Sequence, residues 1–287
     1  MPVKRAIIVW SVTFFLTLAF LVWQKVSGPT YEVRFNETVA GARVSGELLR
    51  THSITGDMPV TVLAPDEAVT ATVVWRRYPT NDAWAQLPMQ RDGQVLRATL
   101  PRQKMAGKLE YHVEMSKDGR MARVPEREAA VARYKGDVPA LVLIFHVTCM
   151  IIGMFFSTSC GLTGLLGGNG SLRVLSQLSF LFLLIGGCIL GPIVQKYAFD
   201  AYWTGWPLGT DWTDNKLAVG ALVWLVAAWR CRPARAGQPT GRWWAVAAML
   251  VIFVVYGIPH SIHGSTLDYE SGQHIQALAR LHLPLLG

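Results

Sequence analysis

Long apolar runs alternate with polar stretches along this chain, and five of the runs are near the length that crosses a lipid bilayer. A helix needs about 20 consecutive apolar residues to span the hydrocarbon core. The fourth run is short unless part of its flank is included, and the five are Ala6–Trp23, Val138–Ser157, Leu175–Val194, Leu217–Trp229 and Trp243–Pro259. The pattern predicts five transmembrane helices.

Two interpretations of the first run are open, a cleaved signal peptide and an uncleaved anchor. Lys4 and Arg5 supply the positive start of a signal peptide, but no A-x-A-like cleavage site follows the long apolar run. Pro29 comes directly after the small residues Ser27 and Gly28, which disfavours processing there. We therefore expect an N-terminal transmembrane anchor over residues 1–27.

Residues 28–137 have a different pattern, in which apolar and polar residues alternate over short stretches. The clearest of these stretches are Val69–Tyr78, Val95–Leu100 and Lys108–Met115. Alternation with β-branched and aromatic residues, interrupted by Asp-Gly pairs, is typical of strands in a β-sandwich. Residues 29–57 are expected to add strands or to form a linker.

The order of features from Val60 to Pro125 resembles that of fibronectin type III-like and immunoglobulin-like domains. The features are an opening strand that ends at Leu63-Ala-Pro65, strands around Val74–Tyr78 and Trp84–Met89, a Leu100-Pro101 edge, and a strand over Leu109–Glu114. The resemblance implies a role in binding or spacing, and it carries over no catalytic residue.

Composition agrees with a membrane protein that contains a small soluble domain. Hydrophobic residues make up 51% of the 287 residues and charged residues only 16%, which is too apolar for an ordinary soluble protein. The net charge of +8 does not indicate a nucleic-acid partner, because many basic residues flank apolar runs, where they set topology.

The distribution of basic residues predicts the orientation. With a cytoplasmic N-terminus, the cytoplasmic face receives Lys4, Arg5, Arg173, Arg230, Arg232, Arg235 and Arg242, as the positive-inside rule expects. The opposite face then receives the β domain, the loop 197–216 and the tail 261–287.

The predicted fold is an all-α bundle of five transmembrane helices, with residues 138–260 forming four of them. An extracytoplasmic all-β sandwich is inserted after the first, and the expected location is a bacterial-type cytoplasmic membrane.

Motifs that would indicate catalysis are absent or fail on context. No G-x-S-x-G, H-E-x-x-H or C-x-x-C-H motif occurs in the chain, so acyl transfer, zinc proteolysis and covalent c-type haem have no support. The glycine-rich stretch 164–170 follows an apolar run and lacks the Lys-Ser/Thr of a phosphate loop. All four cysteines lie in or at the ends of apolar runs, which leaves the β domain without disulfides. The sequence leaves the question of enzyme activity open, and it favours a chain that is not an enzyme on its own.

Three histidines lie where a ligand site is expected. His146 is about 12 Å deep in the second run at 1.5 Å per residue, where an ionisable ring needs a partner. His260 and His263 follow the fifth run and share a face if its helix continues through them. The predicted topology brings all three toward the same side of the membrane as the loop 197–216, and two neutral imidazoles can ligate a haem iron.

The loop 197–216 contains Trp203, Trp206 and Trp212 together with aspartates. It resembles the tryptophan-rich, acid-containing periplasmic loop of the haem-handling proteins of cytochrome c assembly. That resemblance implies haem b at the outer face. We interpret His146 and His260 as iron ligands, His263 as a further binding residue, and the three tryptophans as the wall of the site.

Simpler interpretations stay open. Tryptophan is enriched at membrane interfaces without any ligand, Asp214 precedes the Leu217 run as a helix cap should, and His146 can donate to a carbonyl of a neighbouring helix. The chain is then a non-catalytic scaffold whose residues 28–137 recruit an extracytoplasmic protein partner, with the lipid bilayer as the other partner. A transporter component is a third class, although the five runs show no paired halves.

Overall fold

The helices and strands of the chain form two separate compact units. The computed structural model describes residues 3–168, 170–209, 211–231, 241–260 and 264–272. One unit contains the helices, and the other contains the strands together with the segment that begins at Ser265.

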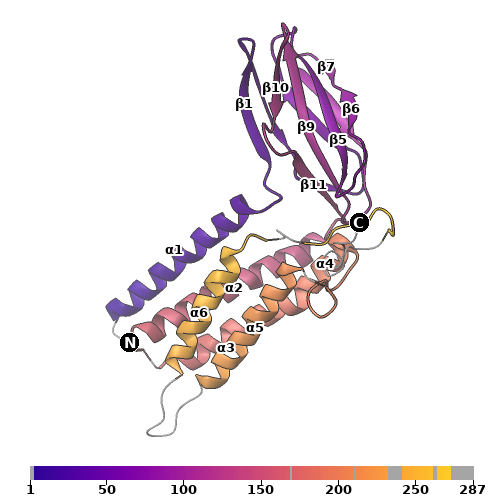
Figure 1. Ribbon diagram of the computed structural model, residues 1–287. Coiled ribbons are helices and arrows are strands. Elements are labelled where there is room, and N and C mark those ends of the chain that lie inside the picture. Colours follow the sequence, from indigo (N-terminus) through magenta and orange to yellow (C-terminus); the bar gives the residue numbers. More distant parts are fainter. Residues whose placement is uncertain (1–2, 169, 210, 232–240, 261–263, 273–287) are drawn as a thin grey trace, which may run out of the picture. The chain divides into compact units, whose positions relative to one another are not determined.

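Helices form at all five apolar runs (Figure 1). They are α1 (Val3–Ser27), α2 (Ala140–Leu165), α3 (Leu172–Leu183), the π-helix η1 (Leu184–Leu190), α4 (Gly191–Phe199), α5 (Trp212–Arg230) and α6 (Arg242–Gly257). The third run is continuous helix from α3 through η1 to α4, with a wider π-helical turn in the middle.

Three helical segments in the described part of the chain are long and apolar enough to cross a membrane. They are Val3–Ser27, Ala140–Leu165 and Leu172–Phe199. α6 is apolar but has only 16 residues, and the first two turns of α5 carry Asp214 and Lys216. The prediction of helices is confirmed at each run, and the dimensions of a membrane span are confirmed for three of them.

Small residues of α2 allow close packing in the helical unit. A Cβ at Gly161 would overlap the side chain of Met249 on α6, and one at Gly164 would lie 2.8 Å from the carbonyl oxygen of Arg242. On another side of α2, a Cβ at Gly153 would lie 3.1 Å from Leu183. Such approaches are typical of helices that associate through van der Waals contact in lipid.

The second unit is a β-sandwich-like domain of two sheets, as predicted. In order across the first sheet, the strands are β1 (Val33–Val39), β2 (Ala42–Leu48), β4 (Met58–Leu63), β8 (Val95–Leu100) and β7 (Gln90–Asp92). The second sheet contains β3 (Thr51–Ser53), β11 (Ala130–Lys135), β9 (Lys108–Lys117), β5 (Thr70–Tyr78) and β6 (Ala85–Pro88), and β10 (Arg120–Val124) also pairs with β9. Residues 29–57, left open by the sequence, therefore contribute three strands.

One hydrophobic core lies between the two sheets. Alternate residues of β9 enter it, namely Leu109, Tyr111, Val113 and Met115. The hydroxyl of Tyr111 donates to the carbonyl oxygen of Leu49 at 2.8 Å, so the buried polar group has a partner. The other residues of β9 lie on the outer side of the sheet, because successive side chains of a strand point to opposite faces.

The described part of the predicted tail lies against the β domain. Ser265–Gly272 follows α6 in the sequence, and its residues group with the strands. The N–H of Leu267 donates to the carbonyl oxygen of Ala106 at 3.0 Å, and the hydroxyl of Tyr269 contacts the main chain of Lys108. This segment is therefore a structural part of the β domain.

Candidate functional site

His146 lies on α2 and contacts the π-helix. Its Nδ1 is 2.8 Å from the carbonyl oxygen of Gly186. A carbonyl oxygen can only accept, so Nδ1 carries a proton, and when the ring is neutral Nε2 keeps its lone pair. Among the described residues, Nε2 makes no hydrogen bond. A histidine that binds a metal is usually oriented by the same kind of bond from its other ring nitrogen.

The π-helix and its glycines make this contact available. The N–H of Gly191 bonds to the carbonyl oxygen of Gly186, five residues earlier, so the turn is wider than in an α-helix. A Cβ at Gly186 would lie 2.9 Å from the Cβ of Cys149, and only glycine lets α2 approach this closely. Single π-helical turns inside α-helices are frequent at functional sites.

The other two candidate ligands, His260 and His263, come after the end of α6 in the sequence. α6 ends at Gly257, so the helix does not continue through His260, which lies in a turn. His263 lies outside the described residues. Within the described ranges, no three or more His, Cys, Asp or Glu side chains are grouped as a metal ion would require.

The loop between α4 and α5 is held together by its own polar groups. The buried carboxylate of Asp214 accepts from the N–H of Thr204 at 2.7 Å, and the side-chain oxygen of Asn215 accepts from the N–H of Trp206 at 2.7 Å. Asp211 caps α5 by accepting from the N–H of Thr213 at 2.8 Å. The acidic residues of the loop thus fix its main chain, but the helix begins at Trp212, so its cap is Asp211 and not Asp214 as the sequence indicated.

The tryptophan rings of this loop are mostly exposed. Trp206 is 75% exposed and Trp212 is 51% exposed, while the partly buried Trp203 donates its indole N–H to the carbonyl oxygen of Trp206 at 3.1 Å. In the described part of the chain, no hydrogen bond or ring contact joins these rings to His146. Exposed rings at the end of apolar helices are typical of an interfacial belt.

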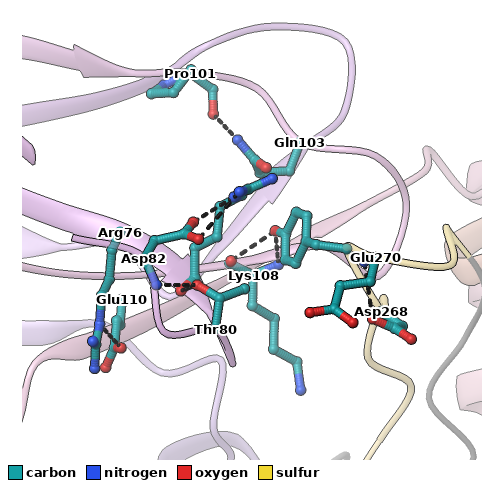
Figure 2. Close-up of polar contacts among 11 residues, drawn as sticks. Arg76, Thr80, Asp82, Pro101, Gln103, Lys108, Glu110, Asp268 and Glu270 are labelled. Carbon is teal, nitrogen blue, oxygen red and sulfur yellow. Dashed lines mark hydrogen bonds and ion pairs between the residues drawn. The ribbon is translucent and has the colours of Figure 1, made fainter. Parts of the chain in front are cut away.

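A second site, which the sequence analysis did not identify, lies on the β domain at the start of β6. It is a recess of about 130 Å³, lined by Trp75, Arg76, Arg77, Asp82, Ala83, Ala85 and Gln103. Figure 2 shows Arg76 beside Glu110, with Asp82 and Gln103 close by. Lys108, Asp268 and Glu270 appear in the same view of the β unit.

Both arginines of the recess are held in place by carboxylates and rings. Arg76 donates to Glu110 of the neighbouring strand β9 and stacks 4.5 Å from the ring centre of Trp84. Arg77 donates twice to Asp82, at 2.6 and 3.2 Å, and the guanidinium lowers the pKa of that carboxyl. A planar guanidinium fixed in this way keeps further N–H donors for a partner.

His112 lies on the outer side of β9 next to the same aromatic group. Its ring packs edge-on against Trp84 at 5.4 Å, and its Nε2 is 3.2 Å from the carboxylate of Glu114. Nδ1 is buried and has no hydrogen bond in the described structure. Burial lowers the pKa of His112, although the bond to Glu114 acts in the opposite direction.

The sequence carries one signal for the recess, the run Trp75-Arg76-Arg77. Trp75, Arg76 and Arg77 are consecutive in a strand, so two adjacent arginines must point to opposite faces. A charged residue at a core-facing position near a strand end marks the rim of the sandwich, where Arg77 lies.

Comparison with family models, curated proteins and solved structures finds no match for this chain.

Proposed function

We propose that this protein is a membrane-anchored adaptor whose β domain binds an extracytoplasmic protein partner at the recess beside β6. The observation that carries the proposal is the pair of fixed arginines that line the recess together with Trp75, one of which, Arg76, stacks on Trp84. Aromatic residues and arginine are enriched where partners bind most strongly. The three long apolar helices support the anchor.

The chemistry of the recess defines the kind of partner segment. Trp75 and Ala85 offer apolar surface, and the remaining N–H groups of Arg76 and Arg77 offer donors. We infer a segment that places an apolar side chain in the recess and carbonyl or carboxylate acceptors at its rim. In the predicted orientation, with a cytoplasmic N-terminus and a bacterial-type cytoplasmic membrane, such a partner lies outside the cytoplasm.

Photo-crosslinking in native membranes tests this proposal. A benzoylphenylalanine at Ala83, in the full-length chain, should give a discrete protein adduct that Arg77→Glu abolishes. The matched control is the same residue at Thr38, an exposed position on β1. Absence of an adduct at residue 83, or the same adducts from both positions, would overturn the adaptor proposal.

A haem-handling role is a second candidate, and the bond between His146 and Gly186 favours it. The bond fixes the ring and leaves Nε2 as a neutral donor to iron. When bound, haem b would supply redox chemistry or be the group that is passed on. His146 fits as one ligand, and the exposed tryptophans fit an open site better than an enclosed one.

Absorption spectroscopy decides on the haem candidate. The full-length protein, purified in mild detergent from haem-replete cells, should show a Soret band that His146→Ala removes. His52→Ala is the control, because His52 lies on β3 in the other unit. A flat visible spectrum would reject the haem role and leave the adaptor proposal untouched.

The orientation can be tested independently. The loop between α4 and α5 belongs outside the cytoplasm in our proposal, together with the β domain. A reporter enzyme that is active only outside the cytoplasm should therefore be active when fused after Lys216. Activity restricted to a cytoplasmic reporter at this position would overturn the orientation.

A further inference from the structure

Two arginines stack on three tryptophans where α5 ends and α6 begins. The guanidinium carbon of Arg230 lies 5.1 Å from the ring centres of both Trp229 and Trp244, and that of Arg242 lies 4.8 Å from Trp243. The three rings are between 44% and 58% exposed. We call these five residues the Arg–Trp surface.

The main chain holds the two halves of this surface together. The thiol of Cys231 donates to the carbonyl oxygen of Gly241 at 3.3 Å, and a Cβ at Gly241 would overlap the carbonyl group of Arg230. Arg230 stacks on a ring from each helix. Figure 1 shows the end of α5 and the start of α6 at the same end of the helical unit, and these two helix ends carry both guanidiniums and all three indoles.

The positive charge of this surface is not balanced inside the helical unit. From Val138 to Gly264 the sequence contains three acidic residues, Asp200, Asp211 and Asp214, and all precede or begin α5. Arg230 is at the last residue of that helix, 16 residues beyond Asp214 in the sequence. Among the described residues, neither Arg230 nor Arg242 forms an ion pair.

Exposed apolar side chains occur further along the same two helices. Leu222 and Leu225 of α5 and Leu250 of α6 are each about half exposed or more. Tryptophans beside such residues lie at the headgroup level of a bilayer. A guanidinium at that depth matches the geometry of a phosphate, to which it donates through two parallel N–H groups.

We propose that the Arg–Trp surface binds the phosphate of anionic phospholipid headgroups in the membrane. The inference rests on the membrane-embedded placement in the proposed function, and it adds a lipid class and a defined site. The stacked rings hold the guanidiniums in the headgroup layer. There the guanidiniums bind lipid phosphates instead of carboxylates of the protein. Neutral zwitterionic lipid binds less well because its headgroup carries no net negative charge.

Native mass spectrometry tests lipid selection. The full-length protein, released from nanodiscs of phosphatidylcholine with a minor fraction of phosphatidylglycerol, should retain phosphatidylglycerol well above its bulk share. In the double variant Arg230→Gln/Arg242→Gln that preference should fall about thirtyfold, as expected from roughly 1 kcal/mol for each of the two basic residues near an anionic surface. Lys25→Gln, at an exposed basic residue of α1 that stacks on no ring in the described structure, should keep it.

A charge-conserving variant separates a stacked site from general attraction. Arg230→Lys/Arg242→Lys keeps the charge but loses the planar fork, so it should show a clear loss of preference. Retention of phosphatidylglycerol by the wild type at no more than its bulk share, or full preference in the lysine variant, would overturn the proposal. Extraction of membranes with alkaline carbonate tests membrane embedding separately. A protein that resists extraction but shows no lipid preference would refute lipid binding at the Arg–Trp surface and leave the membrane anchor of the proposed function intact.

Discussion

The hydroxyl of Tyr269 bonds to both main-chain polar atoms of Lys108. It accepts from the N–H at 2.9 Å and donates to the carbonyl oxygen at 2.8 Å. Burial raises the pKa of Tyr269 to about 12, so the hydroxyl keeps the proton that it donates at neutral pH. The segment after α6 is thereby attached to the first residue of the central strand β9.

Replacing Tyr269 by Phe should loosen this segment without removing its ring. The ring of Phe can still lie under Arg77, which stacks 5.1 Å from the ring centre, but both hydrogen bonds are lost. We expect a local destabilisation of about 1–3 kcal/mol, because a buried N–H and a carbonyl oxygen lose their partner.

Amide hydrogen exchange of the full-length protein measures this change. Exchange in residues 265–272 and around Lys108 should accelerate about tenfold or more, since local opening controls the rate. Tyr31→Phe is the control, because its hydroxyl makes no hydrogen bond in the described structure and its ring stacks with Arg34. Unchanged exchange in Tyr269→Phe would show that the two bonds do not hold the segment.

The stability of the β domain should fall in mild acid because of His112. Burial lowers the pKa of His112 in the folded domain, while the unfolded chain keeps a value of about 6.5. Below that pH the unfolded chain binds the proton more readily, so protonation favours unfolding. The groups that act on His112 are Glu114, which raises its pKa, and Arg123 of β10, which lowers it. Arg76 stacks on Trp84, the ring that packs against His112.

Thermal unfolding followed by tryptophan fluorescence tests this pH dependence. Between about pH 7.5 and about pH 5, the wild type should lose more thermal stability than His112→Leu, in which no proton can bind. His52→Leu changes a histidine that is partly exposed on β3 and should keep the wild-type dependence. If thermal stability fell equally with pH in the wild type and in His112→Leu, protonation of His112 would not be the cause of the loss.

Local patterns in the sequence predicted the helices and strands. They did not predict contacts between residues that are far apart in the chain. The strand Val95–Leu100 follows from the alternation of apolar and polar residues, and the helices follow from the length of the apolar runs. Tyr269 and Lys108 are 161 residues apart, and nothing in either local pattern indicates their pairing. The same applies to His146, for which a carbonyl partner was foreseen but not the π-helical turn that presents Gly186.

Removing the Asp214 carboxylate should disorder the loop before α5. The buried carboxylate accepts from the N–H of Thr204 at 2.7 Å, and Asp214→Ala leaves that N–H without its acceptor. We expect a cost of about 1–3 kcal/mol and a change in the fluorescence of Trp203 and Trp206. Asp200→Asn alters an exposed carboxylate that pairs with Lys196, and it should leave the tryptophan emission unchanged. Identical spectra for wild type and Asp214→Ala would mean that the loop is held by other contacts.

Enlarging Gly161 should separate α2 from α6. A Cβ at this position would overlap Met249, and the side chain can yield only by moving within the buried packing between the helices. We expect Gly161→Val to destabilise the helical unit by about 1–3 kcal/mol, as overpacked cores do. Gly257→Ala is the control, because nothing lies within 4 Å of a Cβ at that position. Thermal aggregation in detergent should begin at a lower temperature for Gly161→Val alone. Equal onset for both variants would show that α2 and α6 do not pack in the protein at the distance described.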